Sequence, residues 1–291
     1  MPARFRLHAA PATLVSLAVI LALVGVALMA LSGAEAAGQQ QPQCGDTITA
    51  DTTLDKNLVD CPNFGIVIGA DNITLDLNGH LIDGLGPLES PDGVVIGGYD
   101  GVTVKHGRVR GFDVGVSAGI ALARKNVARH TRLLGVSSTR NIDGMQLHIV
   151  RSLVRNSSVA GNIHRGTGML LFRSDHVRLL HNSFRHNSMT GMSVFESTNN
   201  LIEENRFSRN RFRDGIAMNG GSRNVLKRNI AKENGEDGFD IEERTAKLTG
   251  NRAVRNHDLG IEAVRGVING GGNEASGNGD PRQCTNVVCS R

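Results

Sequence analysis

The sequence predicts an all-β protein, a right-handed parallel β-helix of about ten coils with three short strands in each coil. Three observations on the chain beyond Leu31 support this prediction. The first is that short runs of alternating apolar residues resemble strands, and the second is that no long amphipathic helix pattern is present. The third and strongest is a glycine followed by an apolar residue that recurs at intervals of 22 to 24 residues, with one interval of 29. The recurrences are Gly93-Val94, Gly115-Val116, Gly144-Met145, Gly168-Met169, Gly191-Met192, Gly215-Ile216, Gly238-Phe239 and Gly260-Ile261.

Residues 1–36 are predicted to be a signal peptide. Arg4 and Arg6 give a positive start, Leu14–Leu31 is apolar, and small residues follow at Ala34-Glu35-Ala36, where a signal peptidase would cut. The apolar stretch is also long enough to span a bilayer, so an uncleaved anchor is the alternative. Cleavage would give a protein that is secreted, extracellular or in the cell envelope, with no further membrane attachment.

The four cysteines fall in two local pairs that flank the repeats, in an N-terminal cap (residues 37–62) and a C-terminal cap or tail (residues 269–291). About ten coils at ~4.8 Å each would separate the chain ends far beyond the ~7 Å that a disulfide spans. A solenoid therefore predicts Cys44–Cys61 and Cys284–Cys289 disulfides, each stapling one end. Free thiols, or a metal bound by Cys284 and Cys289, are the alternatives.

Residues 63–268 are predicted to be the β-helix proper, and asparagines recur through it in phase with the glycines. Stacked asparagines can join their side-chain amides into ladders and tolerate left-handed backbone, so we expect them to hold the corners of the coils. One predicted ladder contains Asn182, Asn205, Asn229 and Asn251, and the other contains Asn187, Asn210, Asn234 and Asn256.

The charge and aromatic content of the chain limit the classes of ligand that it could bind. Removing Arg4, Arg6 and Glu35 lowers the formal net charge from +4 to +3, which is mildly basic. Nucleic-acid binding would call for a basic face interleaved with aromatic side chains, and one tyrosine without any tryptophan does not supply it. We expect a monomer that does not bind nucleic acid.

Alternation along each strand predicts which side chains point out of the coil. With the repeated glycine at position 0, positions −1, +2 and +4 should face solvent. On this basis carboxylates gather near the C-terminal end of one sheet, with two phenylalanines a few coils earlier. The predicted catalytic residues are Asp237, Asp240, Glu242 and Arg265, with Arg244 as another candidate base; the predicted ligand-binding residues are Phe172, Phe195, Asp214, Asn219 and Glu262.

Hard carboxylate oxygens at this spacing could bind calcium, and the metal set would be Asp214, Asp237, Asp240 and Glu262. Calcium could bridge to an acidic polysaccharide and stabilise the charge that forms when a base removes a proton beside a uronate carboxyl. Paired carboxylates could instead hydrolyse a glycosidic bond. A solvated acidic face without chemistry is the alternative.

Motifs in the first predicted coils resemble those of a known protein family. The run Asn72–His80 leads to Ile82-Asp83-Gly84, and Gly101–Gly107 is followed by Gly111-Phe112. Over about residues 44–289 the chain resembles secreted right-handed parallel β-helix repeat proteins of the pectate-lyase-like and NosD-like group. That resemblance implies the fold and is compatible with lyases, hydrolases, epimerases, copper-insertion accessory proteins and non-catalytic binders.

Two local features refine the resemblance. Gly238–Glu242 is similar to the Gly-Phe-Asp-Pro-His segment of alginate C5-epimerases, with Ile241 in place of proline, Glu242 in place of histidine, and Asp237 where that family has tyrosine. His176, His181 and His186 form the densest histidine stretch, and a metal-handling role of the NosD kind would use such residues.

The sequence therefore predicts an exported β-helix protein that engages extracellular polysaccharide, by binding or by cleavage of an acidic glycan. The alternative is a non-catalytic structural or surface-interaction protein, and metal handling is a third hypothesis. Whether the protein is an enzyme is left open by the sequence.

Overall fold

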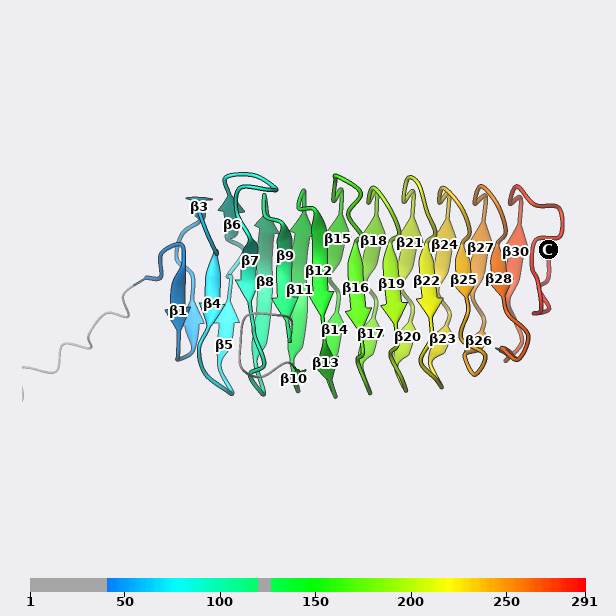
Figure 1. Cartoon of the computed structure of the whole chain (residues 1–291), viewed down its shortest axis with the longest axis horizontal. Coiled ribbons are helices and arrows are strands. Elements are labelled where there is room, and N and C mark those ends of the chain that lie inside the picture. The colour runs from blue at the N-terminus through cyan, green and yellow to red at the C-terminus, as the bar shows by residue number, and fades with distance from the viewer. Residues whose placement is uncertain (1–40, 120–126) are drawn as a thin grey trace, which may run out of the picture. The chain divides into compact units, whose positions relative to one another are not determined.

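Short parallel strands wind into a solenoid in the computed structural model, which describes residues 41–119 and 127–291 (Figure 1). The predicted signal peptide, residues 1–36, lies outside the described residues. Within the described ranges no helix is long and apolar enough to cross a membrane. The all-β prediction is confirmed.

One strand from every coil contributes to a ten-stranded parallel sheet, here called sheet A. Its ten strands correspond to ten coils, as the repeat predicts. In order along the sheet they are β1 (Asp46–Ile48), β4 (Ile66–Ile68), β7 (Asp92–Val95), β9 (Val114–Ala118), β12 (Asp143–Leu147), β16 (Met169–Phe172), β19 (Met192–Phe195), β22 (Ile216–Asn219), β25 (Phe239–Ile241) and β28 (Ile261–Ala263).

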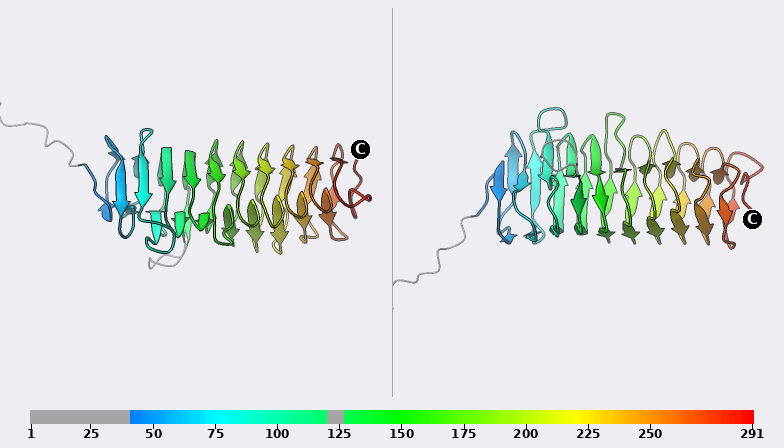
Figure 2. Two further views of the ribbon diagram at one scale, coloured as in Figure 1. Left: turned by 90° about the horizontal axis from the view of Figure 1, so that it is seen from above. Right: turned by 60° about the horizontal axis from the view of Figure 1, so that its bottom comes forward.

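The remaining strands form two further rows, so each regular coil contains three strands (Figure 2). Row 2 contains β2 (Thr52–Thr53), β5 (Thr74–Asp76), β8 (Thr103–Arg110), β11 (Arg132–Thr139), β14 (Leu153–Arg155), β17 (Arg178–Leu180), β20 (Leu201–Glu203), β23 (Val225–Lys227), β26 (Lys247–Thr249) and β29 (Ile268–Asn269). Row 3 contains β3 (Leu58–Cys61), β6 (Leu81–Gly84), the second halves of β8 and β11, β15 (Ser158–Ala160), β18 (Ser183–Arg185), β21 (Arg206–Ser208), β24 (Ile230–Lys232), β27 (Arg252–Val254) and β30 (Glu274–Ser276). A small extra pair joins β10 (Ala128–Arg129) to β13 (Ile149–Val150).

Inward side chains of the three rows stack into one continuous apolar core. The apolar residue after each repeated glycine is fully buried, as Met192, Ile216 and Phe239 illustrate. Phe184 and Phe207 stack inside neighbouring coils with ring centroids 5.1 Å apart. Because each coil buries its apolar face only against its neighbours, the core extends along the helix axis rather than closing around one centre.

Both predicted asparagine ladders are present and buried. In the first, the Asn205 amide donates to Asn229 Oδ1 (3.1 Å), and in the second the Asn210 amide donates to Asn234 Oδ1 (2.9 Å). The second ladder continues through Asn278 to Gln283. A third ladder, which the sequence analysis missed, joins Asn200 and Asn224 to the buried carboxylate of Glu243.

The repeated glycine is required by the ladder beside it. A Cβ atom on Gly215 would lie 2.6 Å from the carbonyl oxygen of Gly238 and 2.8 Å from Nδ2 of Asn234. Real Cβ atoms do not approach other atoms so closely. Glycine and asparagine therefore recur together because the amide of one coil occupies the space where a side chain would begin.

We expect Gly215→Ala to lower the free energy of unfolding by about 2–3 kcal/mol, since overpacking a close-packed interior forces its neighbours to move. Gly79→Ala is a matched control, because Gly79 has a φ of +80° but open space around it. That control should lose only the left-handed penalty of about 1–2 kcal/mol. Chemical denaturation measures both, and equal losses would contradict the steric explanation.

The two ends carry the predicted disulfides, Cys44–Cys61 and Cys284–Cys289. Cys61 is fully buried at the end of β3, and Cys284 pairs by a β-bridge with Ile261 of β28, the last strand of sheet A. The predicted N-terminal cap contains β1 to β3, which already pair with the next coil. Each disulfide therefore closes a loop within a terminal segment, and β-pairing attaches that segment to the neighbouring coil.

Candidate functional site

The outer face of sheet A carries a hollow of about 470 Å³ beside β25 and β28. Four residues nominated from the sequence, Asp240, Glu242, Glu262 and Arg265, line this hollow. Thr285 and Asn286 of the C-terminal segment complete its wall. The disulfide-anchored tail therefore forms one side of the candidate site.

Asp240 and Glu262 are direct neighbours across β25 and β28. Burial, followed by the negative charges of Asp214, Glu242, Glu262 and Glu236, raises the pKa of Asp240 to about 7. Near neutral pH a large fraction of Asp240 is therefore protonated, beside the exposed side chain of Glu262. A protonated carboxyl beside an exposed carboxylate side chain can act as a proton donor.

Asp214 and Asp237 differ from the expectation that position −1 faces solvent. Both are buried, because each carboxylate turns to accept a backbone N–H of the next coil. Asp214 Oδ1 accepts from the N–H of Asp237 (3.0 Å), and Asp237 Oδ1 accepts from the N–H of Leu259 (2.7 Å). Their first role is to satisfy backbone donors between coils, and they do not line the hollow.

Asp237 is nevertheless coupled electrostatically to the hollow. Burial is the largest cause that raises the pKa of Asp237 to about 8. The hydrogen bond from Leu259 opposes this shift, and a hydrogen bond with Glu262 and the charge of Asp214 contribute to it. Asp237 is therefore a proton-holding neighbour of Glu262.

An aromatic platform precedes the hollow on the same face. Phe172 and Phe195 are neighbours across β16 and β19, stacked with ring centroids 5.9 Å apart and an interplanar angle of 14°. His148 meets the edge of Phe172, and Asn219 follows Phe195 in register on β22. The predicted ligand-binding residues Phe172, Phe195 and Asn219 therefore form one row that approaches the hollow along the helix axis.

No group of three or more His, Cys, Asp or Glu side chains is arranged to hold a metal ion within residues 41–119 and 127–291. The calcium set nominated from the sequence stays a prediction, with two of its members, Asp214 and Asp237, turned toward backbone. His176, His181 and His186 lie before β17, between β17 and β18, and after β18. A strand separates each histidine from the next, and His176 and His181 pair with Asp175 and Glu204.

Sequence reasoning missed a second carboxylate group on sheet A. Burial raises the pKa of Asp92, which accepts a hydrogen bond from the hydroxyl of Ser117 (2.5 Å). Burial also raises the pKa of Asp113, with the charge of Asp143 adding to the effect. Asp143 already belongs to the position −1 series that begins at Gly144, and extending that series back to Gly93 would have added Asp92.

An all-β solenoid with a polar and aromatic row along one parallel sheet defines a parallel β-helix protein. The chain belongs to the right-handed β-helix family, whose model, described as "Right handed beta helix region", matches residues 92–280. No curated protein matches the sequence significantly.

Solved structures share the fold at low sequence identity. The periplasmic alginate epimerase AlgG has a TM-score of 0.59 at 15% identity, covering 84% of this chain and 72% of its own. The Dettilon tailspike protein gp208 has a TM-score of 0.57 at 15% identity, covering 83% and 60%. The Azotobacter vinelandii mannuronan C-5 epimerase AlgE6 A-module has a TM-score of 0.54 at 14% identity, covering 75% and 60%. The chain thus spans less than two thirds of the length of the tailspike and of the AlgE6 module.

Proposed function

We propose that the outer face of sheet A binds a polysaccharide chain and that the hollow beside β25 and β28 cleaves it. The observation that carries the proposal is the row from Phe172 and Phe195 through Asn219, followed in the next two coils by Asp240 and Glu262. Stacked aromatic rings suit the apolar faces of sugars. The alginate epimerases among the fold neighbours suggest alginate as one glycan to test.

Hydrolysis is the reaction that this arrangement supports best. Asp240, with its raised pKa, would protonate the leaving glycosidic oxygen, while Glu262 in the neighbouring strand would act as base or nucleophile. Asp237, nominated with Asp240 from the sequence, would instead position Glu262 through their hydrogen bond. Glu242 would contribute negative charge at the wall of the hollow.

A lyase reaction is the second candidate, because Arg265 lines the same hollow as Asp240 and Glu262. In that reaction a base removes a proton beside a uronate carboxyl and the glycosidic bond breaks by elimination. The two reactions differ in product: elimination leaves an unsaturated sugar that absorbs ultraviolet light, and hydrolysis leaves a saturated one. Product analysis therefore assigns the reaction.

Two variants separate binding from turnover on a panel of polyuronates and neutral glycans. Phe172→Ala with Phe195→Ala should weaken glycan binding about tenfold through loss of aromatic contact. Asp240→Asn should keep binding and lower turnover by about 100-fold or more, the usual contribution of a general acid. Calorimetry measures binding, and release of reducing ends measures turnover.

The control is Glu274→Gln, which removes an exposed carboxylate of β30 in row 3. It should leave both binding and turnover unchanged. Binding without turnover in the wild-type protein would restrict the proposal to a glycan-binding role. If no glycan on the panel binds, the proposal is wrong, and a structural or surface-interaction role is favoured.

A further inference from the structure

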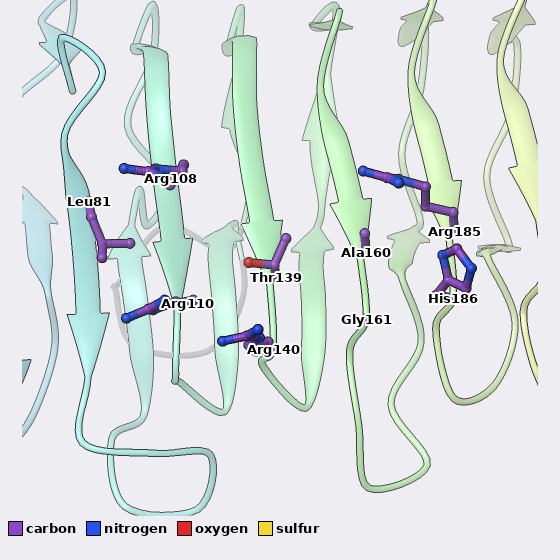
Figure 3. Close-up of a pocket in the computed structure, with 9 residues that line it drawn as sticks. All are labelled: Leu81, Arg108, Arg110, Thr139, Arg140, Ala160, Gly161, Arg185 and His186. Atoms are coloured by element: carbon purple, nitrogen blue, oxygen red, sulfur yellow. The ribbon is translucent and has the colours of Figure 1, made fainter.

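A second concave surface lies in row 3, away from the sheet A site. It is a trough of about 390 Å³ that crosses the coils containing β6, β8, β11, β15 and β18 (Figure 3). Its lining residues are Leu81, Arg108, Arg110, Thr139, Arg140, Ala160, Gly161, Arg185 and His186. None of them belongs to the site on sheet A.

Small residues form the floor of the trough. The outward row runs in register from Arg110 through Thr139 and Ala160 to Arg185, so two short side chains separate two long ones. Next to Ala160, a Cβ atom on Gly161 would meet nothing within 4 Å. Arg185 extends from β18 over the neighbouring coil toward Ala160 (Figure 3). The hollow therefore results from the residue sizes in two central coils.

The trough carries a clear excess of positive charge. Its lining includes four arginines, and one carboxylate, that of Asp83, pairs with them. Asp83 binds Arg110 through two hydrogen bonds of 3.0 and 2.6 Å. Across the described part of the chain, no carboxylate forms an ion pair with Arg108, Arg140 or Arg185. These three guanidinium groups are available to a ligand.

Paired cations in later coils on the same side of the solenoid provide a comparison for the trough. In the turns after row 3, Arg209 and Arg255 both pair with Glu233, at 2.8 Å each, and Lys232 joins them at 3.2 Å. Hydrogen bonds from Arg255, Arg209 and Lys232 lower the pKa of Glu233 to about 2. Arg209, Arg255 and Lys232 are therefore neutralised by Glu233, whereas Arg108, Arg140 and Arg185 have no carboxylate partner among the described residues.

We infer that the trough binds a linear anionic polysaccharide, with Arg108, Arg140 and Arg185 contacting its carboxylate or sulfate groups. The planar guanidinium fork matches both groups in bidentate geometry. The three arginines are distributed along the helix axis over four coils spaced ~4.8 Å apart, with the coil of Ala160 between those of Arg140 and Arg185, so they match a ligand whose charges repeat along a chain. This site is independent of the proposed function on sheet A and would hold a glycan without cleaving it.

A glycan fits the trough better than a nucleic acid does. Non-specific binding of single-stranded nucleic acid combines a basic groove with aromatic side chains on which bases stack. The trough contains no phenylalanine or tyrosine, and His186 is its one aromatic ring. Sugars with charged substituents need no stacking platform when the arginines supply the contacts.

The test uses the full chain carrying Phe172→Ala and Phe195→Ala, so that the proposed sheet A site binds glycan weakly, and compares two double variants that each remove two positive charges from the same side of the solenoid. Arg140→Gln with Arg185→Gln should weaken binding of alginate oligosaccharides about 20-fold, through loss of charge-assisted hydrogen bonds. The matched control, Arg209→Gln with Arg255→Gln, removes arginines already paired with Glu233 and should change affinity less than about threefold. Ala160→Phe should also weaken binding, because it fills the floor without changing the charge.

Sulfated dextran, neutral dextran and single-stranded DNA serve as parallel probes. Binding of alginate alone, sulfated dextran alone or both supports the inference and identifies the anionic group. Equal losses in the two double variants would overturn it in favour of a general charge effect, as would equal affinity for neutral dextran. DNA binding as tight as glycan binding would also overturn it, and so would no binding of either anionic glycan. Phe172→Ala with Phe195→Ala should leave trough binding intact, so failure of one site is distinguishable from failure of the other.

Discussion

Replacing Asn210 by alanine is expected to lower the free energy of unfolding by about 3 kcal/mol, which corresponds to a fall in Tm of about 6–12 °C. The Asn210 amide donates to Asn234 Oδ1, and its own Oδ1 accepts from both the backbone N–H and the amide of Asn187. All three asparagines are buried. Alanine would remove the acceptor of the buried backbone N–H and side-chain amide of Asn187, while Asn234 Oδ1 would keep only the backbone N–H of residue 210. Each buried donor left without its acceptor costs about 1–3 kcal/mol.

Asn219→Ala is the matched control for this prediction. Asn219 lies on the outer face of sheet A, half-buried, and makes no side-chain hydrogen bond with any described residue. Its removal should change Tm by no more than about 2 °C. Thermal and chemical unfolding measure both variants, and equal shifts would show that the ladder does not stabilise the solenoid.

The second large effect is a loss of stability as the pH rises. Burial raises the pKa of Asp240 to about 7 and that of Asp237 to about 8, above the ordinary value of 3.8. Between about pH 4 and pH 8 the unfolded chain therefore releases protons that the folded chain retains. The stability contributed by the protonated carboxyls is complete below pH ~4 and is lost as the pH passes the folded pKa values.

Urea unfolding at intervals between about pH 5 and pH 8 should therefore show a falling midpoint in the wild-type protein. Asp240→Asn should reduce this slope, because the amide cannot ionise. Asp175→Asn is the control: hydrogen bonds from Asn199, His176 and Thr198 outweigh the desolvation of Asp175 and lower its pKa, so it does not titrate in this window. A midpoint that is constant or rises with pH would contradict the raised pKa values.

The same titration bears on the proposed chemistry. A general acid works best when its pKa lies near the operating pH. If turnover on sheet A depends on protonated Asp240, it should fall as the pH rises above about 7, together with stability. If turnover by the wild-type protein does not fall as the pH rises above about 7, a proton donor other than Asp240 is favoured.

The coil itself could be predicted because the same residue types recur at the same positions in successive repeats. The glycine must be glycine since the ladder amide occupies its Cβ position, and the residue after it must be apolar since it points into the core. Both asparagine ladders and both disulfides follow from this repetition and from the distance between the chain ends. Because this residue pattern recurs from coil to coil, contacts between distant parts of the chain have little influence on the fold.

The site could be predicted only in part. Alternation correctly placed Phe172, Phe195, Asp240 and Glu262 on the outer face of sheet A. It misplaced Asp214 and Asp237, because a carboxylate next to a buried backbone N–H gains more from that hydrogen bond than from solvent. The alternation of a strand predicts whether a side chain points inward or outward. It does not predict whether an outward carboxylate turns back to accept a hydrogen bond from an unpaired backbone N–H.

The cationic trough could not be predicted from the sequence. Arg108, Arg140 and Arg185 occupy different positions within their coils, two on strands and one in a turn, so no sequence period connects them. Register between coils brings them together around Thr139 and Ala160. The arrangement becomes a cationic trough because its one paired carboxylate, Asp83, binds Arg110, whereas Glu233 in a later coil pairs with three cations.

Residue identity and the intervals of recurrence were sufficient to predict the solenoid, its ten coils, two of its three buried ladders and its two terminal disulfides. Register between coils was needed to show which outward side chains share a hollow, which carboxylates turn toward backbone donors, and which arginines of the trough have no carboxylate partner. Periodicity and burial can be recognised within one repeat, whereas charge pairing and hydrogen-bond competition take place between coils.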